Sequence, residues 1–322
     1  MSGKSDPQAS HQAGGERPPR LSFGLPVWNG EATLRRCLDS LLAQDFTDFE
    51  VVVSDNASTD GTSRILDEYA ARDPRIRVSR NQENIGQIEN VNLVFRQSRG
   101  EYFRWIGATD WLEPHYASRC IEALDADPGA ILVTSYFRIH RGDGTSRYEE
   151  YRGERVDSER PERRFARMLW FYQAGDAKYD PIYSMMRRDA LARTHLVWMM
   201  DWGDRMMGAE LALLGRFQHV PECLAHRTKG SGEEHRDYAE LLRRYHPTRS
   251  RELPATPSRI FRSLLSIIRA APLTRRQRIH CQWAAFKLYL RRAYHRFREA
   301  TTRFRRATLR LNRENLRALF PR

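Results

Sequence analysis

Carboxylate and amide side chains follow short apolar runs at several points between residues 21 and 116. Asp55 ends the run FEVVVSD, where a carboxylate can accept a hydrogen bond from a nucleobase imide or a ribose hydroxyl. Asn84 and Gly86 precede a predicted helix, and backbone N–H groups at a helix N-terminus favour diphosphate oxygens. Asp110 follows three small residues in IGATDWLEP, although a metal site usually has two acids. Together these residue types predict a site for a phosphate-bearing ligand.

The elements that would position these residues alternate between strands and helices. The predicted strands cover residues 21–27, 49–55, 76–81, 101–107 and 130–140, and the predicted helices cover 31–44, 61–73, 87–100 and 114–127, the last opened by Pro114. Such alternation implies right-handed crossovers and a mostly parallel sheet. Ligands bind such sheets beyond the carboxyl ends of the strands, so the loops after Val27, Ser54, Arg80 and Gly107 are the candidate site.

The second half of the chain is predicted to hold fewer strands. A polar stretch at residues 147–164 reads as a surface loop, followed by helices at 165–173 and 203–216 and short strands at 181–188 and 217–224. From about Pro254 onward the pattern is helical, with a long helix from about Thr274.

Composition limits the class of protein. The chain has 322 residues, of which 40% are hydrophobic, and it lacks the run of about 18 apolar residues that a membrane span needs. Residues 1–20 are rich in Gly, Pro, Ser and Gln and predict a disordered leader without a secretory signal. The four cysteines are far apart in the sequence, which argues against a zinc site or disulfide framework and suits a reducing cytoplasm.

The net charge of +13 is unevenly distributed. From Arg251 to Arg322 there are 19 Lys and Arg against three acids, whereas the rest of the chain has 35 basic and 38 acidic residues. The high pI therefore concerns the partner of the C-terminal region and not the ligand of the core.

The loop after the first predicted strand reads PVWNGEATL and has no G-x-G-x-x-G, which argues against a dinucleotide-binding fold. It offers Pro26, Asn29 and Glu31 instead. Asn56 and Asp60 in SDNASTDGT are expected to shape the next loop and cap its helix.

Four loops in this order resemble those of family 2 glycosyltransferases of the GT-A fold. The segments LPVWNGEATL, VVVSDNASTDGT, ENIGQIENVN and GEYFRWIGATDWLEP carry the resemblance, which extends over Leu21 to His140 and more loosely over Met168 to Arg227. It implies a Rossmann-like α/β fold, a mostly parallel sheet flanked by helices, here with a basic helical C-terminal extension. It also implies a nucleotide-sugar donor over the strand ends. By position, Pro26, Asn29 and Glu31 would line the nucleotide pocket, Asp55 would contact base or ribose, and Asn84, Gly86 and Gln87 would lie near ribose and diphosphate.

The family's metal-binding D-x-D falls on residues 107–110 and is changed here. Thr109 stands at the position that usually ligates Mn²⁺ or Mg²⁺ most directly, with Asp110 beside it. Magnesium often takes only one or two protein carboxylates, because water and phosphates complete its shell. The resemblance therefore implies a weakened metal site at Asp110. The alternative is that Asp110 caps the helix opened by Pro114.

The catalytic base implied by the resemblance is Asp204, an acid that opens a helix before the strand containing VPECL. Members of this family invert the anomeric centre, and a carboxylate deprotonates the acceptor hydroxyl. Asp201 could share that side of the helix, whereas Glu210, six residues on, points elsewhere. The alternative is that Asp204 is only an acid stabilised by the helix dipole. His226 and His235 are expected in an acceptor-side loop.

The predicted division is a leader at 1–20, a glycosyltransferase domain at 21–235 with donor (21–140) and acceptor (141–235) halves, and a basic helical region at 236–322. The last region has apolar residues recurring at three, four or seven positions, namely Ile279, Trp283, Phe286, Leu290, Phe297 and Phe304. This pattern suits an amphipathic helix on anionic lipid, and equally a helix packed on the core with solvated arginines. Nucleic acid is the least favoured partner, because no binding module is recognisable.

These observations predict a cytoplasmic, membrane-peripheral, inverting glycosyltransferase. It would move a sugar from a nucleotide donor to a glycan, lipid-linked or small-molecule acceptor, with Mn²⁺ or Mg²⁺. The alternative is a non-catalytic nucleotide-sugar-binding or scaffold protein with a degenerate metal loop.

Overall fold

The computed structural model describes residues 17–150, 156–173, 181–229 and 238–319. Most of the predicted leader and His235 lie outside these residues. All four cysteines lie within them and are free thiols.

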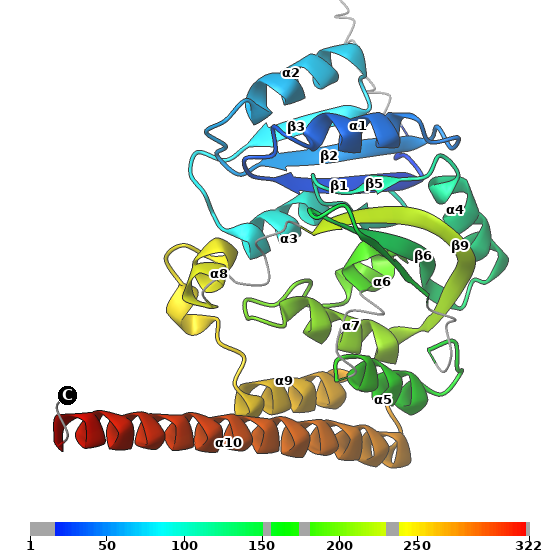
Figure 1. Cartoon of the computed structure of the whole chain (residues 1–322). Helices are drawn as coiled ribbons and strands as arrows, with labels where there is room; N and C mark the ends of the chain where they lie inside the picture. The colour runs from blue at the N-terminus through cyan, green and yellow to red at the C-terminus, as the bar shows by residue number, and fades with distance from the viewer. Residues whose placement is uncertain (1–16, 151–155, 174–180, 230–237, 320–322) are drawn as a thin grey trace, which may run out of the picture.

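A mixed sheet of nine strands runs through the described part of the chain (Figure 1). The strands are β1 (Leu21–Val27), β2 (Phe49–Asp55), β3 (Ile76–Arg80), β4 (Tyr102–Trp105), β5 (Trp111–Leu112), β6 (Ala130–Arg141), β7 (Ser146–Glu149), β8 (Met185–Arg187) and β9 (Arg216–Lys229). Their order is β3-β2-β1-β4-β8-β6-β9-β5, with β7 paired to β6. Strands β1 to β4 are parallel, as the alternation predicts, whereas β8, β5 and β7 run antiparallel to their neighbours.

One face of the sheet is covered by α1 (Leu34–Leu42), α2 (Thr62–Arg72) and α4 (Tyr116–Ala126). Their apolar residues, such as Leu38, Leu66 and Ile121, pack with Leu21, Phe23, Leu25 and Val27, the alternate residues of β1 that point to this side. The start predicted for α4 is two residues early. Glu113 N donates to Leu224 O of β9, so the chain at Pro114 is still held along the sheet edge.

The other face is covered by α3 (Gln87–Gln97), α6 (Arg188–Ala192) and α7 (Gly203–Leu214), with α8 (Tyr238–Tyr245) beyond α3. Val94 and Phe95 of α3 pack on Phe103 and Trp105 of β4. Strands β5 and β7 were not predicted from the sequence, because β5 has only two residues and β7 is polar. Both form by pairing with a longer strand, β5 with β9 and β7 with β6.

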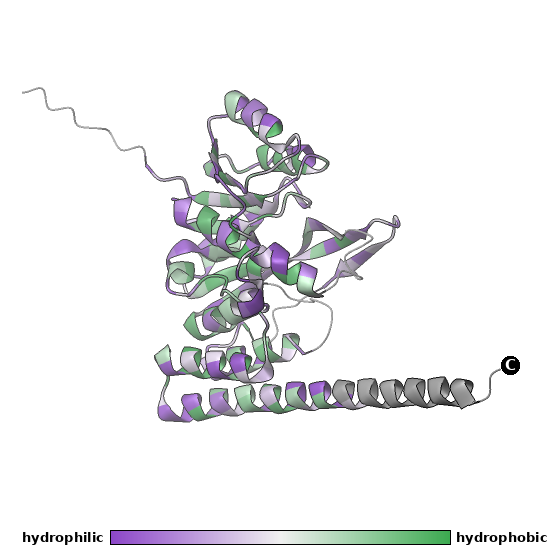
Figure 2. Ribbon diagram, turned by 90° about the vertical axis from the view of Figure 1, so that its left-hand side faces the viewer, coloured by the Kyte–Doolittle hydropathy of each residue, from purple (hydrophilic) through white to green (hydrophobic). Residues whose placement is uncertain are grey.

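An outer layer consists of α5 (Pro161–Phe171), α9 (Pro257–Ala270) and α10 (Arg275–Leu319), which run along the foot of the molecule (Figures 1 and 2). Leu264 and Ile268 of α9, with Cys281 and Leu288 of α10, are buried against α5 and α7. Packing therefore continues across the predicted boundary between residues 235 and 236, and the first part of the C-terminal region shares a core with the domain before it.

Candidate active site

The register of the parallel strands places three loops at one edge of the sheet. Val27 pairs with Asp55, and Asp55 pairs with Arg80, so β1, β2 and β3 end side by side. Pro26 is half-buried near the end of β1, opposite Ser54. The loops that follow are those for which the sequence predicts donor-binding residues.

The loops after β1 and β2 hold each other. Asn29 adopts a left-handed backbone (φ 51°), and its Oδ1 accepts a hydrogen bond from Thr59 N at 2.8 Å. Glu31 Oε2 accepts from Gly61 N at 2.9 Å, while Glu31 N donates to Asp60 Oδ2 at 3.1 Å. Asn29 and Glu31 thus form a rim of fixed geometry at the strand ends.

Asp55 is buried inside its own loop. Its Oδ1 accepts from Ser58 N at 3.0 Å and its Oδ2 accepts from Ser63 Oγ at 2.7 Å, with Arg80 Nε 3.9 Å away. In this arrangement both carboxylate oxygens shape the loop.

A chain of asparagines joins the loop after β3 to β2 and α3. Asn56 Nδ2 donates to Asn84 Oδ1 at 2.9 Å, and Asn56 Oδ1 accepts from Asn81 Nδ2 and from Ile85 N, both at 3.0 Å. Asn81 Nδ2 also donates to Asn90 Oδ1 at 3.1 Å. Asn56, which the sequence predicted to shape its loop and cap the next helix, also connects the loop after β2 to the loop after β3. The signal that could have found this chain is the recurrence of Asn after consecutive strands.

Gly86 begins α3 in a conformation that other residues avoid (φ 87°, ψ 159°). Its N–H donates to Asn84 Oδ1 at 2.8 Å. A Cβ placed there would lie 2.5 Å from Tyr245 O and 2.8 Å from His246 Cα. Gly86 therefore lets the end of α8 approach the loop, in addition to the donor contact predicted for it.

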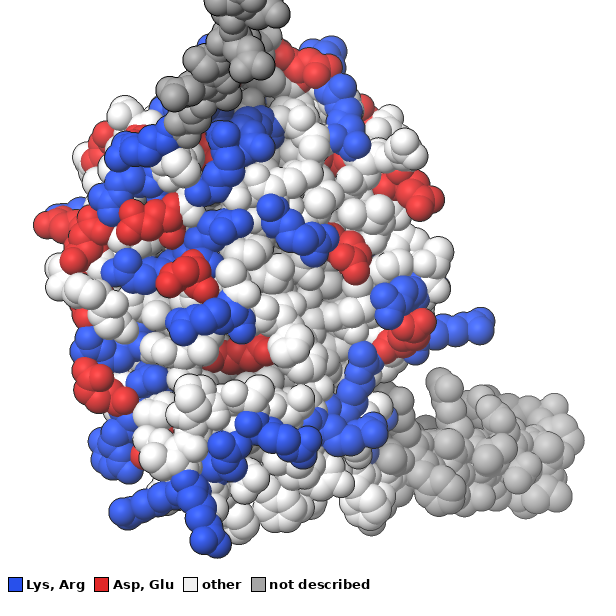
Figure 3. Space-filling model, turned by 180° about the vertical axis from the view of Figure 1, so that it is seen from behind, with Lys and Arg blue, Asp and Glu red and all other residues white. Residues whose placement is uncertain are grey.

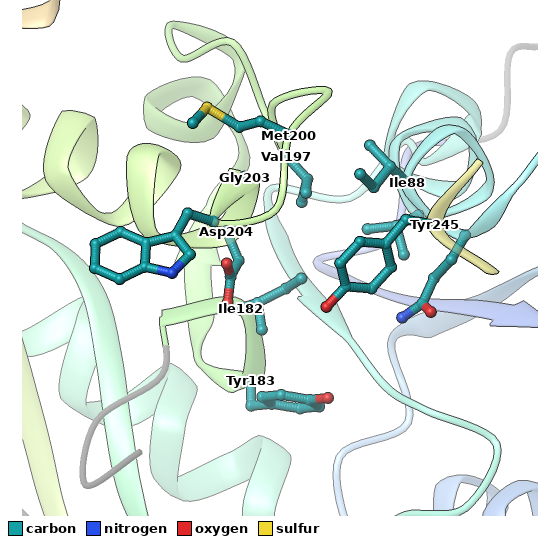
Figure 4. Close-up of a pocket in the computed structure, with 11 residues that line it drawn as sticks. Ile88, Ile182, Tyr183, Val197, Met200, Gly203, Asp204 and Tyr245 are labelled. Carbon is teal, nitrogen blue, oxygen red and sulfur yellow. The ribbon is translucent and has the colours of Figure 1, made fainter. Parts of the chain in front are cut away.

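One pocket of about 170 Å³ brings the two halves of the site together (Figure 4). Gln87 and Ile88 enter it from α3, Asp204 from the first turn of α7, and Tyr245 from the end of α8. Asp204 is half-buried, and in the close-up it points toward the same space as the Tyr245 ring. Tyr245 lies within the predicted C-terminal region and was not expected here.

The segment before Asp204 is strained. Leu196 and Trp202 have positive φ angles of 57° and 111°, and a Cβ on Gly203 would meet Trp198 O. Such conformations persist where surrounding contacts enforce them. Here the Trp202 ring carries the Arg205 guanidinium at 4.3 Å and the Arg292 guanidinium of α10 at 3.8 Å.

The two acids near Asp204 in the sequence, Asp201 and Glu210, have different structural environments. Asp201 precedes α7 instead of lying on it, and its N–H donates to Leu253 O at 2.9 Å. Glu210 is not among the described residues that line the pocket. It accepts hydrogen bonds from His195 N at 3.1 Å and Trp198 Nε1 at 3.2 Å.

Asp110 is 5% exposed and lies in the loop between β4 and β5, next to β9. Its Oδ1 accepts from Thr109 Oγ1 at 3.2 Å and from Thr228 N at 3.3 Å. Burial raises the pKa of Asp110, and the positive charges of Arg227 and Arg104 oppose that rise. Arg227 also stacks on the ring of Tyr183, 3.5 Å from its centroid, and Tyr183 lines the pocket.

An aromatic stack fixes the loop that carries Asp110. Trp111 lies between the Arg36 guanidinium, 3.8 Å from its ring centroid, and the parallel ring of His226 at 4.9 Å. His226 bonds Glu113 Oε1 at 2.7 Å and His140 Nε2 at 3.0 Å. His226 thus belongs to β9 next to Asp110, where its sequence predicted a loop.

A divalent cation at this loop would have one protein carboxylate. Among the described residues, no three His, Cys, Asp or Glu side chains come together in a group that could hold a metal ion. One carboxylate fits Mg²⁺ or Mn²⁺ when phosphate oxygens and water supply the other ligands.

Comparison with known proteins identifies the relatives of this arrangement. The family described as Glycosyl transferase family 2 matches residues 22–194. Chondroitin synthase of Escherichia coli is 36% identical over 113 residues, which are 35% of this chain and 16% of that protein. Glycosyltransferase GlyA of Streptococcus pneumoniae is 27% identical over 164 residues, 51% of this chain and 20% of that protein. The chain thus spans a fifth or less of these two relatives.

Solved structures share the fold. S. aureus TarS 1-349 in complex with UDP-GlcNAc has a TM-score of 0.61 at 18% identity, covering 84% of this chain and 72% of that one. The mannosyltransferase PcManGT of Pyrobaculum calidifontis, in complex with GDP-Man and Mn²⁺, has a TM-score of 0.52 at 16% identity, covering 92% of this chain and 81% of that one. At these identities the likeness shows the GT-A fold alone.

Proposed function

Because the chain belongs to glycosyl transferase family 2, we propose that it moves a sugar from a nucleotide donor to an acceptor hydroxyl by a single inverting displacement. The observation that carries the proposal is the shared pocket of Gln87 and Asp204. It joins the helix that follows the predicted donor loops to the predicted base. The TarS and PcManGT structures, solved in complex with UDP-GlcNAc and GDP-Man, support a nucleotide-sugar donor.

In the proposed reaction, the loops after β1, β2 and β3 hold the nucleotide. Pro26, Asn29 and Glu31 form one side, with Asp55 toward base or ribose. Asn84, Gly86 and Gln87 lie near ribose and diphosphate, at the N-terminus of α3, whose N–H groups favour anions. The internal hydrogen bonds described above keep this rim rigid before the donor arrives.

Asp204 is proposed to accept the proton of the acceptor hydroxyl as that oxygen attacks the anomeric carbon. The bond from this carbon to the diphosphate oxygen breaks, and the nucleoside diphosphate leaves. Arg227, next to Thr228 that binds Asp110, supplies a fixed positive charge near the leaving group. A divalent cation held by Asp110 would neutralise further charge on the diphosphate, and the Mn²⁺ in the PcManGT complex supports this part of the proposal.

The test compares Asp204→Asn with the matched control Asp201→Asn. Hydrolysis and transfer are measured over a panel of nucleotide sugars with Mn²⁺, and nucleoside diphosphate binding is measured by calorimetry. We expect Asp204→Asn to lose roughly 10²–10⁴-fold in turnover with binding kept, while Asp201→Asn stays active. Binding without turnover in the wild type would favour the non-catalytic alternative. If turnover is lost in Asp201→Asn and kept in Asp204→Asn, the base would be Asp201 instead.

The metal proposal has its own test. Asp110→Asn is expected to remove the Mn²⁺ dependence of turnover and to leave the fold intact. Glu113→Gln, a change in the nearest other acid of that loop, should retain the dependence. Unchanged Mn²⁺ dependence in Asp110→Asn would show that the site is misplaced.

We also propose that α10 contacts an anionic membrane surface from the cytoplasmic side. None of the helices in the described segments is both long and apolar enough to cross a membrane. Ile279, Trp283, Leu290, Tyr294 and Phe297 are 50–68% exposed on one side of α10, opposite the buried Cys281, Ala285 and Leu288. Lys and Arg gather along this foot of the molecule (Figure 3). The sequence left open whether this helix packs on the core or lies on anionic lipid. One face of α10 is packed on the core, and the opposite face is exposed and available for lipid.

Truncation would expose the core under α9, so the membrane test uses substitutions. Trp283→Ser with Leu290→Ser should abolish sedimentation with phosphatidylserine-containing vesicles, and Tyr148→Ser on β7 should not. Equal binding to neutral phosphatidylcholine vesicles, or no binding by the intact chain, would overturn the proposal.

A further inference from the structure

We propose that the pocket around Asp204 receives an uncharged apolar group of the acceptor, such as an aromatic ring or alkyl chain beside the reacting hydroxyl. This inference rests on the proposed function, because it takes Asp204 as the base. It narrows the acceptor from any hydroxyl compound to one that carries an apolar group.

Most of the residues that line the pocket have aliphatic or aromatic side chains. Ile88, Val91, Ile182, Val197 and Met200 contribute aliphatic side chains from three segments, and Tyr183, Trp202 and Tyr245 are the aromatic residues of the lining. The volume of about 170 Å³ is close to that of an engineered apolar cavity of roughly 150 Å³ that binds benzene. The size therefore fits one ring or a short alkyl segment.

The carboxylate of Asp204 disfavours the donor's diphosphate at its end of the pocket. Asp204 is the one charged side chain in the described lining, which contains no Lys or Arg. Burial raises the pKa of Tyr245, the carboxylates of Asp201 and Asp204 raise it further, and the guanidinium of Arg205 opposes that rise. The nearby cationic groups are not part of the described lining but stack on its aromatic residues, Arg227 on Tyr183 and Arg205 and Arg292 on Trp202. An anion is thus favoured at the strand ends and disfavoured beside Asp204.

The polar groups of the lining are too few for an unsubstituted sugar. Gln87, Asp204 and the tyrosine hydroxyls could pair with some of its hydroxyl groups. Hydroxyl groups facing Ile182, Val197 or Met200 would lose water without a partner, which costs about 1–3 kcal/mol each. An aromatic ring could instead pack against Tyr183 or Tyr245 without that penalty.

Tyr245 gives this pocket a wall that can be changed separately from the donor loops. It comes from α8, and the contact of its carbonyl with Gly86 holds the end of that helix in place. Tyr245→Ala removes the ring, whereas the matched control Tyr245→Phe keeps the ring and removes only the hydroxyl.

The experiment measures calorimetric binding of phenyl β-D-glucoside, methyl β-D-glucoside and glucose 6-phosphate to the full chain with saturating UDP or GDP, whichever binds more tightly. We expect the phenyl compound to bind about tenfold more tightly than the methyl compound and the phosphate not to bind. Tyr245→Ala should lose that preference and Tyr245→Phe should keep it, with nucleotide affinity unchanged in both. Ile182→Trp, which fills the pocket, should also lose it.

Equal affinities for the phenyl and methyl compounds, or no binding of either, would overturn the inference. So would a preference for the phosphate, or nucleotide affinity that changes with Tyr245→Ala. Failure of the proposed function would look different, because no nucleotide sugar would be turned over and Asp204→Asn would change nothing. The phenyl preference can be measured in either case.

Discussion

Gly86→Ala tests whether the end of α8 is held against the donor loop by the absence of a side chain. Gly86 has φ 87° and ψ 159°, a combination that is essentially limited to glycine and costs another residue about 1–3 kcal/mol. The added Cβ would also lie 2.5 Å from Tyr245 O and 2.8 Å from His246 Cα. Both are backbone atoms, so no side-chain rotation relieves the contact, and α8 must move.

The size of the effect follows from what moves with α8. Leu242 is 6% exposed in the cluster with α3, and shifting the helix would uncover part of it. Full burial of a leucine is worth about 1.5–3 kcal/mol, so partial exposure adds roughly 1 kcal/mol to the strain. Together these effects predict a loss of about 2–4 kcal/mol in the free energy of unfolding. The phenyl glucoside preference should fall as well, because Tyr245 moves with the helix.

Gly144→Ala is the matched control. Gly144 also has a positive φ, of 83°, but a Cβ there meets nothing within 4 Å. Gly144→Ala should lower the free energy of unfolding only by the cost of a left-handed backbone at alanine, about 1–2 kcal/mol. Urea denaturation of both variants measures the difference. If Gly86→Ala loses no more stability than Gly144→Ala, the close approach of α8 is refuted.

Three further outcomes are expected. Leu264→Ala should lower the free energy of unfolding by about 2–5 kcal/mol in urea, because α9 belongs to the buried core. Asn56→Ala should lose about 1–3 kcal/mol and weaken nucleotide binding measured by calorimetry, since it deprives Asn81 and Ile85 N of their acceptor. Burial lowers the pKa of His219 to about 4, so protonation favours unfolding, and stability should fall as the pH drops from about 6.5 toward 4. The contribution of His219 to this loss should reach roughly 3 kcal/mol in urea titrations at each pH, and this share of the loss should be missing in His219→Gln.

Sequence patterns predicted the elements whose own residues determine them. The continuous apolar run of β2 and the helical spacing of Leu34, Cys37, Leu38 and Leu41 in α1 are local signals, and both elements appear where expected. The order of four loops sufficed for the family because each loop follows its strand directly. The donor-binding roles predicted for those loops stay predictions.

Features made by contacts distant in sequence were not predictable. Strand β5 has two residues and exists because Trp111 and Leu112 pair with His226 and Ala225 of β9, more than 100 positions later. Tyr245 reaches the pocket only because α8 returns over Gly86, and no periodicity within residues 238–245 indicates that. The asparagine chain is likewise a property of the loops after β2 and β3 and of α3 together.

Trp202 connects the basic C-terminal helix to the proposed active site. Its ring lines the pocket, its backbone is strained at φ 111°, and Arg292 of α10 stacks on it at 3.8 Å. A strained conformation is kept only while its neighbours enforce it, so a displacement of α10 would release Trp202 and alter the N-terminus of α7, where Asp204 lies. The exposed apolar side of the same helix is the proposed membrane contact. The proposed membrane contact and the proposed base are therefore connected through one helix, which would favour turnover where an acceptor with an apolar group is most concentrated.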